Sequence, residues 1–250
     1  MPHWELLLFF FAIAFVYASV GFGGGSSYLA ILALYALPFK EIRLIALICN
    51  VIVVTGGTII FIRNKQVDFR KILPLVLISV PMAYVGAIMK ISEGTFFVIL
   101  GCSLIVAALL LWVQTSNAKA NILSLNGEPN MVKDGALGGG IGFLSGMVGI
   151  GGGIFLAPLL NLLKWDAPRK IAATASVFIL VNSLAGIAGQ LTQLPHGINY
   201  SQILLLCIAV FAGGQLGSRM GAVKLNPLWI RRLTAILVFA AGVNVLIKHL

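Results

Sequence analysis

Uncharged apolar stretches, separated by short charged segments, cover most of this chain. Two of them are unusually long: 34 residues run from Leu6 to Phe39, and 29 run from Gly135 to Leu163, without Asp, Glu, Lys, Arg or His. As straight helices they would measure about 51 and 44 Å, against about 30 Å for the hydrocarbon core of a bilayer. We therefore expect each long stretch to break.

The remaining apolar stretches have the length of single membrane spans. Each half of the chain has three of them after its long stretch: Leu44–Ile62, Ile72–Met89 and Gly94–Val113, then Ile171–Leu191, Tyr200–Ser218 and Leu228–Ile247. The polar segment Gln114–Asp134 lies between the two sets. The pattern predicts an N-terminal repeat at residues 1–113, a linker at 114–134 and a C-terminal repeat at 135–250, within one integral membrane unit.

Composition supports an all-α polytopic membrane protein. Hydrophobic residues make up 60% of the chain and charged residues only 10%, and the mean hydropathy is +1.04. A soluble domain carries about 25% charged residues, so the lipid bilayer is the expected solvent.

The net charge of +10 lies in short clusters between apolar spans, which disfavours a nucleic-acid surface. The N-terminus lacks the basic region of a signal peptide, so we expect mature protein from Leu6 onward.

The 17 Lys and Arg residues distinguish two topologies. If each long stretch crosses the membrane once, the two sides receive 7 and 10 of them. If each stretch returns to its starting side, one side receives only Lys40, Arg43, Lys90 and Lys248, and the other receives 13. The positive-inside rule favours the second arrangement. It predicts a cell (inner) membrane protein with both termini outside, inverted halves, and a re-entrant hairpin or two short spans in each long stretch.

A glycine segment recurs inside the two long stretches. Val20-Gly21-Phe22-Gly23-Gly24-Gly25 returns 128 residues later as Val148-Gly149-Ile150-Gly151-Gly152-Gly153. Glycine permits sharp reversal, and backbone N–H groups at the following helix N-terminus attract anions. Two such ends from inverted halves would form an electropositive pocket near the midplane. The alternative is that these glycines only allow close helix packing.

Polar residues inside the spans add candidate ligands, and acidic residues do not. All seven Asp and Glu residues lie at span ends or in loops, which disfavours a cation pathway or carboxylate proton relay. No Ser, His and acidic residues converge on a catalytic arrangement, so we do not expect an enzyme. Cys49, Cys102 and Cys207 lie singly in apolar spans without a CxxC pair or His cluster, so we expect no metal or cofactor.

Four segments resemble the sulfite exporter TauE/SafE family. They are Gly21–Gly25, Gly149–Leu160, Ala172–Ser176 and Gly213–Arg219, and the first departs from the family in having Ser26, Ser27 and Tyr28 where a more apolar run is usual. The resemblance covers essentially the whole chain. It implies a multi-pass transporter of small organic or sulfur-containing anions, such as sulfite or sulfonates.

The sequence therefore predicts a secondary transporter of a small anion that works by alternating access at a midplane site, and the family resemblance implies that this anion is a sulfur oxyanion or an organosulfonate. The alternative is an anion-selective channel; a coupling ion and the oligomeric state stay open. Arg219 is the candidate for gating or anion attraction. We expect Gly86→Ala, outside the motifs, to impair transport less than Gly→Ala substitutions at the motif glycines. The candidate substrate-binding residues are Gly21, Gly23, Gly24, Gly25, Ser26, Asn50, Thr55, Gly149, Gly151, Gly152, Gly153, Ile154, Thr174, Ser176, Asn182 and Gln215.

Overall fold

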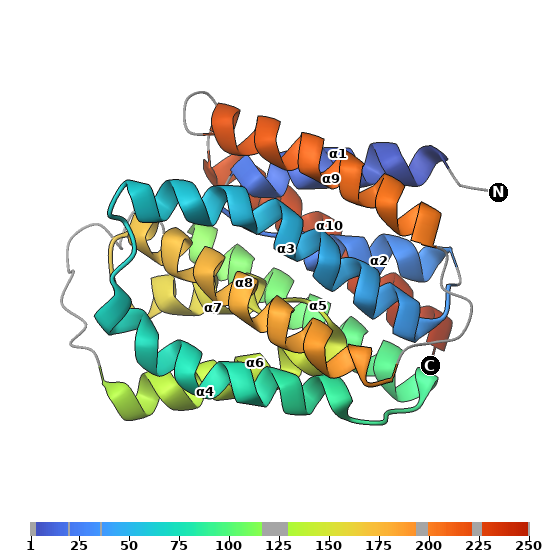
Figure 1. Ribbon diagram of the computed structural model, residues 1–250, viewed down its shortest axis with the longest axis horizontal. Coiled ribbons are helices and arrows are strands. Elements are labelled where there is room, and N and C mark those ends of the chain that lie inside the picture. The colour runs from blue at the N-terminus through green and yellow to red at the C-terminus, as the bar shows by residue number, and fades with distance from the viewer. Residues whose placement is uncertain are drawn as a thin grey trace.

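Charged loops and glycine segments divide the chain into helices. The computed structural model describes residues 4–19, 21–35, 37–116, 130–193, 200–221 and 227–249, which contain ten helices and no strand (Figure 1). The helices are α1 (Trp4–Ser19), α2 (Gly25–Leu34), α3 (Phe39–Arg63), α4 (Phe69–Ile88), α5 (Glu93–Ser116), α6 (Met131–Val148), α7 (Gly153–Leu162), α8 (Pro168–Leu191), α9 (Tyr200–Gly221) and α10 (Pro227–His249).

The helix lengths and surfaces confirm a polytopic membrane protein. Five helices, α3, α4, α5, α8 and α9, are long and apolar enough to cross a bilayer. Large apolar side chains are exposed on their outer faces, among them Leu77, Leu109 and Phe211. Water would penalise so much exposed apolar surface, whereas lipid does not.

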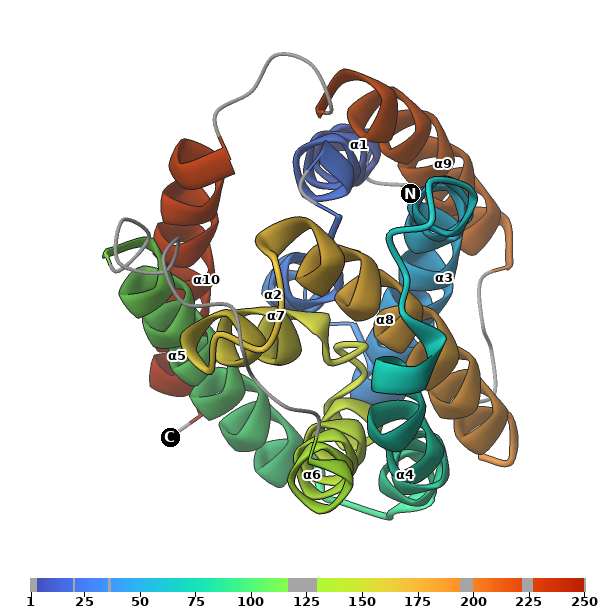
Figure 2. The same ribbon diagram turned by 90° about the vertical axis from the view of Figure 1, so that its left-hand side faces the viewer.

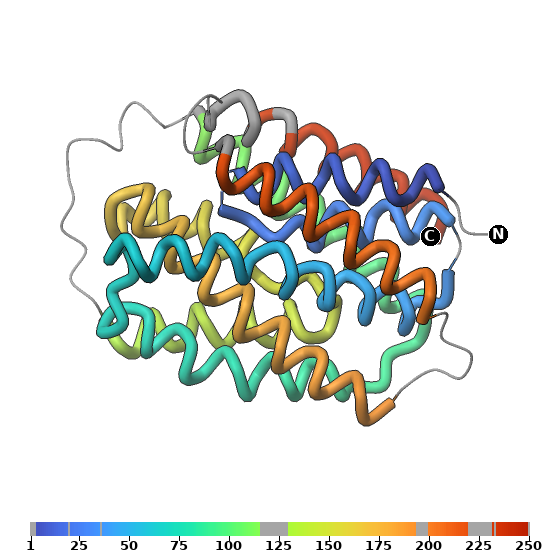
Figure 3. The backbone as a smooth tube through the Cα atoms, turned by 45° about the horizontal axis from the view of Figure 1, so that its top comes forward, coloured from blue at the N-terminus to red at the C-terminus, as the bar shows by residue number. Residues whose placement is uncertain are grey.

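Both long apolar stretches break at their glycine segments, as predicted. In Figures 1 and 3, α1 runs away from the end that carries the N-terminus, and α2 runs back toward that end. Each second arm, α2 or α7, has 10 residues and therefore measures about 15 Å, half of the hydrocarbon core. Each stretch is thus a hairpin of one long and one half-length helix.

The two halves pack in the pattern that an inverted repeat predicts. Corresponding helices, such as α3 and α8, run in opposite directions along the long axis of Figure 1. Helix α1 packs on α9 as α6 packs on α4, while α3 meets α8 and α5 meets α10. In the end-on view of Figure 2, α2 and α7 occupy the centre, and the other helices surround them.

The α3–α4 and α7–α8 loops meet at one end of the molecule. Lys71 Nζ lies 2.8 Å from Asp166 Oδ2, and the same ammonium lies over the Trp165 ring. Burial raises the pKa of Asp166, but hydrogen bonds from Lys71 and the Ala167 N–H, with the charges of Lys71 and Lys170, lower it below its usual value overall. This shared end is what two returning stretches require.

The helices next to the predicted linker extend into it. Residues 114–116 belong to α5 and residues 131–134 to α6, because Asn130 caps α6 by accepting from the N–H groups of Val132 and Lys133. The rest of the predicted linker, residues 117–129, lies outside the described residues.

Glycines on α6 bring its backbone against that of α4. A Cβ built on Gly138, Gly142 or Gly146 would overlap the carbonyl oxygens of Leu75, Ser79 and Ala83, respectively. The spacing of four residues keeps these glycines on one helix face. Small residues drive helix association in membranes by allowing such close approach. Gly86, on α4, is packed in the same way, because its Cβ would overlap the Phe143 carbonyl oxygen. Gly86→Ala would therefore disturb the α4–α6 contact, while its effect on transport relative to the motif glycines stays a prediction.

We predict that Gly146→Ala destabilises the protein and that Gly140→Ala does not. The first methyl group overlaps the Ala83 carbonyl, whereas a Cβ on Gly140 would meet nothing within 4 Å. Overpacking of this kind costs about 1–3 kcal/mol, and an exposed helical Gly→Ala change instead gains up to about 1 kcal/mol. Thermal unfolding of the purified variants in detergent measures both effects. Equal melting temperatures would contradict the close contact between α4 and α6.

The shared loop end predicts a labelling pattern. Cysteines introduced at Arg70 and Arg169, in a protein lacking the three native cysteines, should react with a membrane-impermeant thiol reagent from the same side. Both side chains are exposed near the Lys71–Asp166 pair. A cysteine at Glu93, the first residue of α5, should react from the other side, because α5 starts at the opposite end of the bundle (Figure 1). Labelling of Arg70→Cys and Arg169→Cys from different sides would contradict the returning hairpins.

Candidate functional site

Left-handed glycines reverse the chain in the same way in both halves. Gly21 and Gly149 follow α1 and α6 with φ of 83° and 88°, and Gly24 and Gly152 precede α2 and α7 with φ of 85° and 81°. Side chains with a Cβ rarely adopt these angles. The repeated motif is thus a repeated turn.

The two short helices begin with unsatisfied backbone donors. In α2, the N–H groups of Ser27 and Tyr28 both donate to Gly24 O at 3.0 Å, so the N–H groups of Gly25 and Ser26 have no earlier helical turn to bond. Helix α7 repeats this arrangement, with Gly153 and Ile154 at its start. Neither helix has a side-chain cap at its N-cap glycine. The N-terminus of each short helix therefore carries the positive end of the helix dipole, and no capping side chain compensates that charge.

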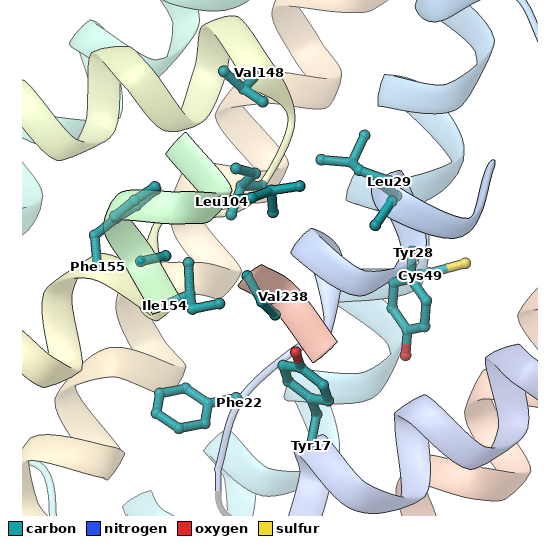
Figure 4. Close-up of a cluster of buried hydrophobic side chains, with 14 of the residues drawn as sticks. Tyr17, Phe22, Tyr28, Leu29, Cys49, Leu104, Val148, Ile154, Phe155 and Val238 are labelled. Carbon is teal, nitrogen blue, oxygen red and sulfur yellow. The ribbon is translucent and has the colours of Figure 1, made fainter. Parts of the chain in front are cut away.

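The two helix starts border one small central cavity. Its volume is about 10 Å³, room for about one water molecule. Figure 4 shows Phe22 and Ile154 from the two halves, with Tyr17 beside them. The lining comprises Tyr17, Phe22, Gly23, Gly24, Gly25, Ser26, Asn50, Ile150, Gly153, Ile154 and Ile179.

Asn50 on α3 lies against both glycine segments. Its Nδ2 donates to Ile150 O at 2.9 Å. A Cβ built on Gly151 would stand 2.6 Å from that nitrogen, and one on Gly23 or Gly25 would overlap the Asn50 amide. Asn50 Oδ1 is buried and has no hydrogen-bond partner. The absence of side chains at these glycines thus makes room for one amide, and that amide keeps a free acceptor.

The second half has no polar equivalent of Asn50. Gly25 faces Asn50, and its counterpart Gly153 faces Ile179. The predicted ligand Asn182 instead donates from Nδ2 to Ser79 Oγ at 3.0 Å and to Phe178 O at 2.8 Å, so it joins α8 to α4. It does not line the cavity. Asn50 and Asn182 lie in corresponding spans of the two halves, but they do not occupy equivalent positions.

The other predicted polar ligands lie away from the cavity. Thr55 Oγ1 donates to Val51 O in its own helix at 2.5 Å, and Ser176 Oγ is 2.8 Å from Thr58 Oγ1 across α3 and α8. Gln215 on α9 lies against Gly56. Thr174 is buried in α8, and Arg219 is exposed in the last turn of α9. None of these side chains lines the central cavity.

Three polar residues around the glycine segments are not among the predicted substrate-binding residues. Tyr17 lines the cavity, and its hydroxyl lies 2.6 Å from Ser27 Oγ. Ser183 Oγ, buried without a partner, lies 2.9 Å from where a Gly151 Cβ would stand. Arg43 is only 4% exposed. Its position in the sequence could have identified it. Arg43 is one of only four Lys and Arg residues assigned to the side of the membrane with fewer positive charges, and it lies next to the start of an apolar span.

The chain is similar to a family of membrane transporters along almost its whole length. The sulfite exporter TauE/SafE family profile matches residues 6–245. A probable membrane transporter protein, y4hK of Sinorhizobium fredii, is 32% identical over 96% of this chain and 97% of its own length. The probable membrane transporter protein YunE of Bacillus subtilis is 29% identical over 67% of each chain. A Haemophilus influenzae probable membrane transporter protein is 23% identical over 90% of this chain and 88% of its own. No solved structure gave a significant match.

Proposed function

This chain belongs to the sulfite exporter TauE/SafE family of membrane transporters, and we propose that it carries a small anion by alternating access at the central glycine cavity. The substrate in this proposal is a sulfur oxyanion or an organosulfonate. The observation that carries it is the meeting of two uncapped helix starts, at Gly25 and Gly153, on one cavity.

The helix starts favour an anion over a cation. Backbone N–H groups and positive dipole ends stabilise negative charge without a buried Lys or Arg. Among the described lining residues there is no Asp or Glu to oppose that charge. The glycine residues let the anion approach the backbone, and the apolar side chains of Phe22, Ile154 and Ile179 keep water away from it. Electrostatic attraction strengthens in such a dry site.

Asn50 suggests which anions fit. Its Nδ2 is used by Ile150 O, so the buried Oδ1 is the atom that faces a ligand without a partner. A buried acceptor without a donor costs about 1–3 kcal/mol. An oxyanion that still carries a proton, such as hydrogen sulfite, would donate to this oxygen while accepting from the helix N–H groups.

The closed cavity favours a carrier over a channel. Space for about one water between Gly23–Ser26 and Gly153–Ile154 gives no continuous aqueous path at the centre, so the substrate would need a conformational change to pass. Uptake of sulfite, thiosulfate, sulfate and short alkanesulfonates into proteoliposomes tests the proposal. Saturable flux that an opposing gradient of the same anion accelerates supports the carrier. Single-channel currents would instead support the anion channel, and no flux of any anion would refute both.

We predict that Asn50→Ala lowers transport far more than Asn182→Ala. Both amides are fully buried, donate from Nδ2 across helices and leave Oδ1 unpaired, so their truncation should destabilise the fold to a similar extent. Only Asn50 lines the cavity. Loss of one ligand contact of about 1.4 kcal/mol lowers the ratio of maximal rate to KM about tenfold. Equal transport losses in the two variants would contradict a substrate site at Asn50.

Arg219 remains the proposed attracting or gating charge, although it lies outside the cavity. Arg219→Ala should reduce transport at low salt several-fold by weakening long-range attraction, and Arg219→Lys should restore most of it if charge alone matters. Arg63, also exposed in the last turn of a helix, provides the matched control. If Arg63→Ala and Arg219→Ala behave alike in proteoliposomes, Arg219 has no specific role.

A further inference from the structure

A second and larger cleft opens at the end of the molecule opposite the loop ion pair. It lies where the start of α3, the end of α4 and the end of α8 come together, and its volume is about 180 Å³, against about 10 Å³ for the central cavity. Figure 1 places these three helix ends on the side that carries the chain termini. We call this space the basic cleft.

Among the described residues, every ionisable side chain that lines the basic cleft is cationic. Lys40 and Arg43 come from α3, and Lys90 follows α4. None of the described lining residues carries a carboxylate. These three are among only four Lys and Arg residues that the charge count assigned to this side of the membrane. Their convergence on one cleft therefore concentrates positive charge on a side that has few other Lys or Arg residues, and such a cleft raises the local concentration of anions.

Two deeply buried side chains leave unpaired donors in the lining. Arg43 is 4% exposed and Gln190 is 7% exposed, and both line the cleft. Arg43 Nε and Gln190 Nε2 have no hydrogen-bond partner. Buried donors without partners are rare because each costs free energy. An oxyanion, with several acceptor oxygens, would satisfy both at once.

Helix capping explains the role of only one hydrogen-bonding nitrogen of the Arg43 side chain. Its Nη2 donates to Gly146 O at 3.0 Å and to Ala87 O at 3.3 Å. Both carbonyls lie in the last turns of α6 and α4, where helices lack their own donors, so the cation stabilises both ends. This role uses one nitrogen and leaves Nε unexplained.

Arg43 also connects the basic cleft to the central site. A Cβ built on Gly149 would stand 3.2 Å from Arg43 Cα. Arg43, Leu47 and Asn50 share one face of α3, with Arg43 and Asn50 about 10 Å apart along the helix. Leu47 lies between them, fully buried, and its Cδ1 stands 3.0 Å from where a Gly186 Cβ would be. One leucine thus separates the cleft from the cavity along this face.

We infer that the basic cleft is a second anion site, in which Arg43 Nε and Gln190 Nε2 bind a small oxyanion while Lys40 and Lys90 attract it. The site takes a free oxyanion rather than a lipid headgroup. Its identification with the transported anion, waiting outside Leu47, rests on the proposed function.

Thiol labelling tests the cleft without requiring transport. Met89 lines it and is 40% exposed, so Met89→Cys, in a protein without native cysteines, reports on it. We expect an anionic methanethiosulfonate that carries ethylsulfonate to react about tenfold faster than its trimethylammonium analogue. Combining Lys40→Gln with Lys90→Gln should remove this preference, and high salt should reduce it. Lys133→Gln, exposed at the start of α6, should leave it unchanged.

Protection by inorganic sulfate distinguishes a binding site from general attraction. In phosphatidylcholine nanodiscs, sulfate should slow the labelling of Met89→Cys, and Gln190→Leu should raise the sulfate concentration required several-fold. Gln190→Leu keeps the side-chain size, whereas Arg43→Gln would also uncap two helices. Labelling without charge preference, or without sulfate protection, would overturn the inference. Protection by added phosphatidylglycerol but not by sulfate would also overturn it, by assigning the cleft to a lipid headgroup.

Transport then separates this inference from the proposed function. In proteoliposomes, the Lys40→Gln and Lys90→Gln double variant should raise KM for sulfite several-fold without lowering the maximal rate. If the double variant transports sulfite with an unchanged KM, the cleft does not bind substrate on its way to the central site. The proposed central site would be unaffected by that result. If the unaltered protein transports no anion, yet sulfate protects Met89→Cys, the proposed function fails and the anion site remains.

Discussion

Reversal of the backbone inside an apolar layer is the constraint on which this molecule depends. Lipid cannot satisfy N–H and C=O groups, so a chain that turns within the membrane must turn where protein surrounds it. Glycines at positive φ make the turn possible at Gly21 and Gly24, and again at Gly149 and Gly152. The surrounding helices shield these turns from lipid (Figure 2). The N–H groups that the turn exposes are then available to a ligand, so the feature that breaks the helix also prepares the site.

The two halves repeat the backbone more faithfully than the chemistry. Gly21 and Gly149 have nearly equal φ angles, as do Gly24 and Gly152, whereas Gly151 has a positive φ and its counterpart Gly23 does not. Equivalent helices make equivalent contacts. Yet Asn50 is matched by Ile179 beside the glycine segments, and Arg43 beside Gly149 is matched by Ala172 beside Gly21. The central cavity therefore has one polar and one apolar wall. Such a site would hold a substrate in one orientation, and it would treat the two membrane sides differently even on a symmetric scaffold.

The sequence predicted the features that depend on local chemistry, and it missed those that depend on helix rotation. Helix breaks and span lengths follow from glycine and from the thickness of the bilayer. In contrast, whether Asn50 or Asn182 faces the cavity depends on how α3 and α8 rotate against their neighbours, and an apolar span has no polar face to reveal this. Arg43 was missed because a charge was taken to end the span. The spacing of Gly138, Gly142 and Gly146 could have predicted the α4–α6 contact, since four-residue steps place small residues on one face.

The contacts at the loop end are weak enough to be broken in a transport cycle. Thr58 and Ser176 share one hydrogen bond between α3 and α8, worth about 0.5–1.5 kcal/mol. The Lys71–Asp166 pair is partly exposed, which limits it to about 0–1 kcal/mol. Their sum of about 0.5–2.5 kcal/mol is within the few kcal/mol that separate interconverting conformations. The α4–α6 interface, by contrast, is joined along three glycines and should move as one body. In the alternating access proposed above, α3 would separate from α8 at this end, with the glycine turns as the fixed centre between them.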